Sequence, residues 1–172
     1  MSDQETTIYL AHGASGSAAS MASHVEGMRR RGYQAQAVGL PIGKAERAVD
    51  EYRRQVEQLP SAVIGGQSYG GRVASLLAAE VAPRGLVLFS YPLHPPGKAD
   101  PDARVAHWPQ IGCPVLLLSG ESDPFARIDL LRAAVSALGD ARLITYPRLG
   151  HSLRPVLDEA LDRVAEFVAR LP

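Results

Sequence analysis

Short apolar runs alternate along this chain with segments of helical periodicity, and that alternation restricts its possible folds more than any other feature. Five of the six runs are nearly all apolar, which is typical of strands buried on both faces. The remaining run, Tyr33–Val38, contains glutamines and is expected at a sheet edge. Strands that alternate with helices form a parallel sheet covered by helices on both faces. The expected strands are Thr7–Ala11, Tyr33–Val38, Ala62–Gly65, Leu86–Ser90, Val115–Ser119 and Arg142–Tyr146.

Apolar residues at helical spacing occupy the segments between and after these strands. One stripe is followed by Gly139, which favours a helix C-terminus there. In the last segment, Ser152 can cap the start of a helix and Pro155 fits its first turn. The stripes consist of Ala45, Ala48, Val49, Tyr52, Val56 and Leu59; of Ile128, Leu131, Val135 and Leu138; and of Leu153, Leu157, Ala160, Leu161, Val164, Phe167, Val168 and Leu171.

This pattern predicts an α/β fold, a three-layer α/β/α sandwich with about six mostly parallel strands. The 172 residues suffice for one full core and not for two, so we expect a single domain over residues 1–172. The segment Tyr91–Cys113 contains five prolines and cannot form a long helix. Because no separate cap domain fits in so short a segment, we expect a shallow, open site.

Charge and cysteine content exclude several classes of protein. The 18 basic and 18 acidic residues give no net charge, whereas general binders of nucleic acid or anionic membranes usually carry a basic excess. The lone Cys113 cannot form an internal disulfide. No apolar run approaches the ~20 residues that span a bilayer, and the first residues show no signal-peptide pattern. We therefore expect a cytoplasmic protein that binds neither nucleic acid nor membrane.

The most informative motif is the turn Gly66-x-Ser68-x-Gly70. It follows an expected buried strand and precedes an apolar helical stripe. A turn between such elements forces the serine into a strained conformation with its hydroxyl exposed, and the flanking glycines relieve the crowding. Glycine-rich turns also hold ordinary serines, but this placement favours Ser68 as a nucleophile.

A serine hydroxyl needs a base, and His151 lies just past the sixth expected strand. The histidine in turn needs an acidic partner that fixes its tautomer, and Asp123 follows the fifth strand. Glu121 is a rival for this role, and Asp129 is a weaker one because it falls in a helical pattern. Since the carboxyl ends of parallel strands meet at one edge of a sheet, Ser68, Asp123 and His151 are expected to converge.

The reaction also needs donors for a developing oxyanion. The backbone N–H of Tyr69, directly after the nucleophile, should be one, and the N–H of Ala14, in the loop after the first strand, should be the other. His12 in the same loop could act as a second base, but we favour a structural role in which its ring braces the loop.

Further side chains are candidates for contact with a substrate. The proline-rich segment follows the fourth strand, so it should reach the edge of the sheet near Ser68; a segment of this kind is either functional or a rigid structural loop. His94 could contact substrate or be held by the loop backbone. Trp108 is either a core residue or a wall of the pocket. Phe125, close to Asp123, is a further possible contact, as is His12.

Taken together, five short segments of the sequence resemble the α/β-hydrolase superfamily. More narrowly, they resemble its small dienelactone-hydrolase-related group, which includes the Tex30 and KANSL3-type proteins. The resemblance covers nearly the whole chain and implies an α/β-hydrolase fold with Ser68, Asp123 and His151 as a triad. Dienelactone hydrolases proper have a cysteine nucleophile where this chain has Ser68. The five segments are His12–Gly16, Gly66–Gly71, Ser90–Lys98, Ser119–Phe125 and Gly150–Ser152.

We therefore predict a serine hydrolase that cleaves a carboxylic ester, or else a thioester, of a small soluble substrate through an acyl-enzyme. A non-catalytic interaction domain with this fold is the alternative, and lyase or perhydrolase chemistry at the same triad is a third reading. No metal or other cofactor is expected: the five histidines lack metal-ligand spacing. The segment Gly39–Ala45 departs from a phosphate loop because its glycines are too close and Ala45 replaces the Ser/Thr.

Overall fold

The computed structural model describes residues 6–98 and 100–172, and within them six parallel strands form one sheet in the order β2-β1-β3-β4-β5-β6. This arrangement confirms the predicted number of strands and the expected edge position of β2. The strands are β1 (Thr7–Ala11), β2 (Gln34–Val38), β3 (Val63–Gln67), β4 (Gly85–Phe89), β5 (Val115–Gly120) and β6 (Ala141–Tyr146).

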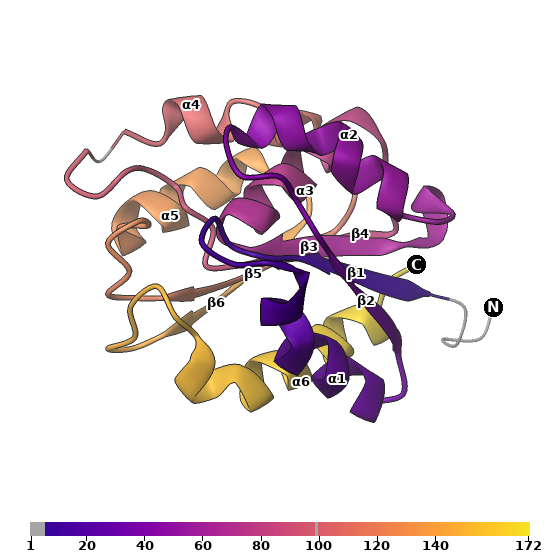
Figure 1. The fold of residues 1–172 in the computed structure, drawn as a ribbon. Coiled ribbons are helices and arrows are strands. Elements are labelled where there is room, and N and C mark those ends of the chain that lie inside the picture. The colour runs from indigo at the N-terminus through magenta and orange to yellow at the C-terminus, as the bar shows by residue number, and fades with distance from the viewer. Residues whose placement is uncertain (1–5, 99) are drawn as a thin grey trace.

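Helices cover both faces of the sheet, so the predicted three-layer sandwich is confirmed (Figure 1). On one face lie α2 (Ala45–Gln55), α3 (Tyr69–Glu80), α4 (Asp102–Val105) and α5 (Ile128–Ala134). On the other lie α1 (Ala22–Arg30) and α6 (Leu157–Ala169). The segment between β4 and β5 holds only α4 and a short 3-10 turn, and no separate cap domain is present in the part of the chain that the structure describes.

The core has one hydrophobic cluster on each face of the sheet, and β4 shows how the sequence builds both. Side chains of successive strand residues point to opposite faces. Leu86 and Leu88 accordingly pack in the cluster under α2 and α3, while Val87 and Phe89 pack in the cluster over α1 and α6. All residues of β4 are buried, as its apolar sequence predicts.

The strand β6 differs from the expectation of burial on both faces. It lies at the second edge of the sheet and pairs only with β5, so it is half-buried, and Arg142 is exposed. Its apolar side chains contact the helix layers on the two faces of the sheet, but no further strand among the described residues lies beyond its outer edge.

Several helix ends also differ from the periodic pattern. The helix α2 ends at Gln55, so Val56 and Leu59 lie past it, the latter in a 3-10 turn. The last α-helix begins only at Leu157, after a 3-10 turn that contains Pro155. Ser152 does not cap α6: its hydroxyl oxygen accepts the Arg154 N–H at 3.3 Å, one turn earlier. The turn that contains Pro155 is thus a 3-10 turn, and the α-helix begins after it.

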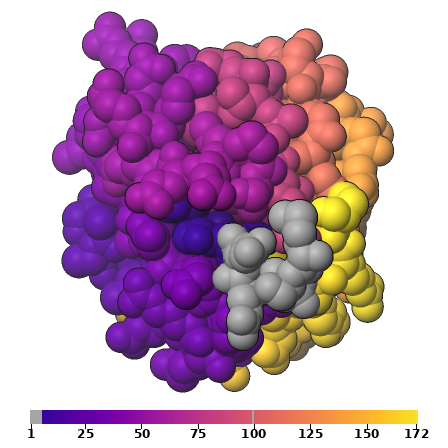
Figure 2. Space-filling model, turned by 90° about the vertical axis from the view of Figure 1, so that its right-hand side faces the viewer, coloured from indigo at the N-terminus to yellow at the C-terminus, as the bar shows by residue number. Residues whose placement is uncertain are grey.

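The end of the chain is fixed near the amino ends of the strands. Arg84, directly before β4, donates to the carbonyl oxygens of Leu171 and Pro172 at 3.3 and 3.2 Å. Figure 2 views this side of the molecule, with the C-terminal residues in yellow at its lower right. The carboxyl ends of the strands, which matter for chemistry, lie on the opposite side.

Candidate active site

Three of the expected functional side chains meet at the carboxyl ends of β3, β5 and β6. The Oγ of Ser68 lies 2.8 Å from Nε2 of His151, and Nδ1 of His151 lies 2.8 Å from Oδ2 of Asp123. A neutral imidazole that carries its proton on Nδ1 donates to the carboxylate and accepts the serine O–H at Nε2. The structure therefore joins Ser68, His151 and Asp123 in one hydrogen-bonded chain.

The serine sits on a sharp turn between β3 and α3. Its φ of 51° and ψ of −117° lie where non-glycine residues are rarely found. The turn also brings α3 against the end of β1: a Cβ added to Gly66 would lie 2.6 Å from the Ala11 carbonyl oxygen, and one added to Gly70 would lie 2.5 Å from it. The Gly-x-Ser-x-Gly spacing thus follows from the close approach of backbones on both sides of Ser68.

Asp123, the acidic residue hydrogen-bonded to His151, is buried and held from two sides. The Asp123 side chain has no exposed surface, whereas 28% of the His151 side chain is exposed. The second carboxylate oxygen of Asp123 accepts the N–H of Phe125 at 2.8 Å. The ring of Phe125 packs on the His151 ring with 4.5 Å between centroids, which limits the orientations open to the imidazole.

The rival carboxylates have other partners. Glu121 accepts the hydroxyl of Thr145 at 2.8 Å and lies 3.5 Å from Arg132. Asp129 is bound by two nitrogens of Arg127 at 2.7 Å each, and hydrogen bonding to that guanidinium lowers the pKa of Asp129 to about 2. Only Asp123, of the three carboxylates considered, is hydrogen-bonded to His151.

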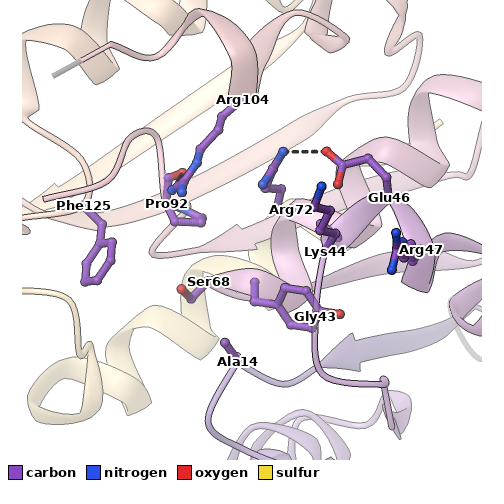
Figure 3. Close-up of a pocket in the computed structure, with 12 residues that line it drawn as sticks. Ala14, Gly43, Lys44, Glu46, Arg47, Ser68, Arg72, Pro92, Arg104 and Phe125 are labelled. Atoms are coloured by element: carbon purple, nitrogen blue, oxygen red, sulfur yellow. Dashed lines mark hydrogen bonds and ion pairs between the residues drawn. The ribbon is translucent and has the colours of Figure 1, made fainter. Parts of the chain in front are cut away.

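The two residues expected to supply the oxyanion donors lie at the same place. A cavity of about 720 Å³ opens beside Ser68 and is lined by Tyr69 and by Ala14, which Figure 3 labels. Tyr69 is the first residue of α3, so its N–H has no acceptor within the helix. Its phenol donates to the Pro41 carbonyl at 2.6 Å and so ties α3 to the loop before α2. Burial, with a smaller effect of Glu46, raises the pKa of Tyr69.

Of the four possible substrate contacts, the structure places only Phe125 in the wall of this cavity. His12 and His94 are buried, and each ring bridges backbone groups. Nδ1 of His12 donates to the Gly13 carbonyl at 2.7 Å, while its Nε2 accepts the Leu40 N–H at 2.9 Å. This geometry agrees with a bracing role for His12.

The His94 ring bridges two backbone groups in the same way as the His12 ring. Trp108, by contrast, is a core residue. Nδ1 of His94 donates to the Pro95 carbonyl at 2.8 Å, and its Nε2 accepts the Arg127 N–H at 3.0 Å. Trp108 is completely buried and packs edge-on against Tyr91. The geometry therefore favours the structural alternative for His12, His94 and Trp108, whose side chains hold loops and core together and do not line this cavity.

Sequence reasoning missed most of the remaining cavity wall. The segment Gly43–Arg47 forms one side, Arg72 lies one turn along α3 from Ser68, and Pro92 and Arg104 come from the proline-rich segment (Figure 3). A signal for Arg72 was present, since residues four apart on a helix share a face. The proline-rich segment does reach the edge of the sheet near Ser68, as its position after β4 predicts.

Two further findings concern what the site could hold. Among residues 6–98 and 100–172, no group of three or more His, Cys, Asp or Glu side chains is placed to bind a metal ion. No helix in this described part of the chain is long and apolar enough to cross a membrane.

Comparison with known proteins gives one family and many structures of the same fold. Residues 40–169 match the family model described as alpha/beta hydrolase domain. A CIB-like hydrolase from Thermoplasma acidophilum has 19% identity and a TM-score of 0.76 over 99% of this chain and 89% of that one. The esterase Pf2001 of Pyrococcus furiosus has 18% identity and a TM-score of 0.80 over 98% and 82%.

A dienelactone hydrolase from Anabaena variabilis has 20% identity and a TM-score of 0.73, with 98% of this chain and 87% of that chain covered. At such identities these structures share the fold with this chain. The narrower resemblance to Tex30 and KANSL3-type proteins is not tested by these matches and stays a prediction.

Proposed function

We propose, from the premise that this chain belongs to the alpha/beta hydrolase family, that it is a serine hydrolase with Ser68 as its nucleophile. One observation carries the proposal: the Ser68 hydroxyl is hydrogen-bonded to His151, and His151 to the buried Asp123, at 2.8 Å each. A serine with a base in reach and a carboxylate that orients the base is the arrangement that activates a hydroxyl for attack.

In the acylation step, Oγ of Ser68 attacks the carbonyl carbon of the substrate and its proton passes to Nε2 of His151. The Asp123 carboxylate stabilises the resulting imidazolium through Nδ1. The carbonyl oxygen becomes an oxyanion that accepts from the N–H groups of Tyr69 and Ala14. Each donor would lower the barrier by ~2.7–4 kcal/mol.

The tetrahedral intermediate then collapses. The bond to the leaving group breaks, and His151 gives its proton from Nε2 to the departing oxygen or sulfur. The acyl group remains as an ester on Ser68. A water molecule, activated by His151, attacks that ester, releases the acid and restores the serine.

We propose a carboxylic ester as the substrate class, with a thioester as the second choice. The cavity of about 720 Å³ is large enough for a small molecule. It is bounded by the segment Gly43–Arg47 at the start of α2 and by the proline-rich segment. We also propose a cytoplasmic location. The lone Cys113 is free and buried, so the fold does not depend on a disulfide that would require an oxidising compartment.

Labelling with a fluorophosphonate tests the nucleophile. The reagent should modify the native protein at Ser68, and Ser68→Ala should abolish both labelling and turnover of short p-nitrophenyl esters. The matched control is Ser136→Ala, which changes an exposed serine in the 3-10 turn directly after α5 and should keep both. A folded sample that is neither labelled nor active would overturn the proposal and favour a non-catalytic interaction domain.

A further inference from the structure

The wall of the cavity beside Ser68 carries charges that ester hydrolysis does not require. Four cationic side chains line it, Lys44, Arg47, Arg72 and Arg104, against the single carboxylate of Glu46. The chain as a whole has no net charge, so this excess of positive charge is local. A cavity lined mainly by one sign of charge attracts ligands of the other sign.

The cations come from three separate segments. Lys44 and Arg47 lie at the start of α2, Arg72 lies on α3, and Arg104 lies on α4 within the proline-rich segment. In Figure 3 the Arg104 side chain ends beside Pro92, and the Arg72 side chain is turned toward Glu46 with Lys44 close by, all in the wall of the same cavity. Their presence in one cavity wall is thus a property of the fold and not of one basic stretch of sequence.

These cations are incompletely neutralised. Arg72, whose side chain is only 20% exposed, donates to Glu46 at 2.8 Å, yet its buried Nε has no partner among the described residues. Arg104 donates to the Pro92 carbonyl at 3.0 Å. Burial and the positive charge of Arg72 lower the pKa of Arg104. Partly buried guanidinium groups that repel each other are stabilised when an anion binds between them.

The start of α2 adds to the positive potential. Residues 43–47, which include the first turn of this eleven-residue helix, belong to the cavity wall. The N-cap residue, Lys44, supplies no side-chain acceptor for the first backbone N–H groups. Free N–H groups and the helix dipole favour negative charge at such a terminus.

The position of the cations relative to Ser68 indicates which part of a substrate they meet. In Figure 3, Phe125 lies on one side of Ser68, and Lys44 and Arg72 lie on the other. Phe125 packs on His151, the residue that would protonate the leaving group. The side with the cations is therefore left for the acyl chain.

We propose that the substrate is an ester or thioester whose acyl chain ends in a carboxylate, held by Arg72 and Arg104 with Lys44 nearby. This inference rests on the proposed function and narrows its substrate class. Hydrolysis would consume one water molecule and release a dicarboxylate and an alcohol or thiol. A planar guanidinium can bind a carboxylate through two parallel hydrogen bonds, which gives direction as well as attraction.

The first test compares p-nitrophenyl half-esters of succinate to suberate with neutral p-nitrophenyl esters of the same acyl length, after subtraction of spontaneous hydrolysis. At the best chain length, kcat/KM should be at least about tenfold higher for the half-ester. Arg104→Gln and Arg72→Gln should each lower the ratio of the two kcat/KM values by about tenfold or more. Arg30→Gln, which removes an exposed cation from α1 on the other face of the sheet, should leave the ratio unchanged.

A second test needs no turnover. Calorimetry with Ser68→Ala should show that adipate binds, that hexanoate binds at least about tenfold more weakly, and that Arg104→Gln removes the difference. Equal binding of the two acids, or binding of inorganic phosphate as tight as that of adipate, would overturn the carboxylate assignment. A preference for 4-acetoxybenzoate over phenyl acetate, without one for half-esters, would place the anion on the leaving group and overturn the acyl assignment.

The two proposals fail in different ways. If Ser68 is labelled by fluorophosphonate but the protein prefers neutral esters, the carboxylate inference is wrong and the hydrolase remains. If adipate binds through Arg104 but no ester is cleaved and Ser68 is not labelled, the hydrolase proposal is wrong and the anion site remains.

Discussion

Gly70 and Ala11 approach so closely that a Cβ on Gly70 would lie 2.5 Å from the carbonyl carbon and oxygen of Ala11. Both atoms belong to backbone, which cannot move aside as the tip of a side chain can. The contact fixes the start of α3 against the end of β1, and through it the position of the Ser68 hydroxyl relative to the loop that carries Ala14.

We expect Gly70→Ala to lower the free energy of unfolding by about 1–3 kcal/mol and to reduce esterase activity, because the added methyl group must push α3 away from β1. Chemical denaturation and kcat measured on the same samples would show this. Gly139→Ala is the matched control, since no heavy atom lies within 4 Å of its added Cβ. Equal stability of the two variants would contradict the prediction.

The Asp123→Asn variant should lower kcat by roughly 10⁴-fold with little change in KM, because an amide can hold His151 in the wrong tautomer and cannot stabilise the imidazolium. Steady-state kinetics with a short p-nitrophenyl ester measures the effect. The substitutions Asp129→Asn and Glu121→Gln, at the two rival carboxylates, should keep kcat within a few-fold of the parent value. A large loss in either would reassign the acidic residue.

Tyr52→Phe should destabilise the fold without a selective effect on the reaction. The buried Tyr52 hydroxyl lies 2.8 Å from the Tyr9 carbonyl oxygen and 2.6 Å from the Gly65 carbonyl oxygen, and it accepts the Gly65 N–H at 2.9 Å. Its removal leaves buried backbone groups unpaired, at a cost of about 1–3 kcal/mol. Urea unfolding should report that loss, while kcat at a temperature where both proteins are folded should change little.

Acid should weaken the fold through His24. Burial lowers the pKa of His24 to about 4 from its usual value of 6.5, so the unfolded chain takes up a proton at a higher pH than the folded one. The stabilising contribution of neutral His24 is therefore complete above pH ~6.5 and is lost as the pH falls from ~6.5 toward ~4. The free energy of unfolding should drop less over this range in His24→Gln than in the parent protein; parallel pH profiles would contradict this prediction.

Local patterns predicted the elements that depend on neighbours in sequence. The strand β3, the turn at Ser68 and the helix α3 follow from a buried run, a glycine-rich turn and an apolar stripe. The glutamines of Tyr33–Val38 correctly indicated an edge. The strand β6 was predicted, but its position at the second edge was missed, because its exposure depends on the strand order of the whole sheet, which its own sequence does not contain.

The environment of the loop residue His94 could not be predicted from the sequence for the same reason. His94 is held by the N–H of Arg127, 33 residues away, and nothing local distinguishes such a residue from one that faces a cavity. The cationic wall was missed because Lys44, Arg72 and Arg104 are far apart in the chain. A net charge of zero conceals a local excess of this kind.

The hydrogen bonds from Arg84 to the last two carbonyl groups have a practical consequence. They hold the end of the chain beside the amino ends of the strands, whereas the cavity opens at the carboxyl ends. If the protein is immobilised on a resin or a sensor chip through a linker added after Pro172, the attachment point lies at the end of the sheet opposite the cavity. The immobilised molecules would then present their cavities to the flowing solution.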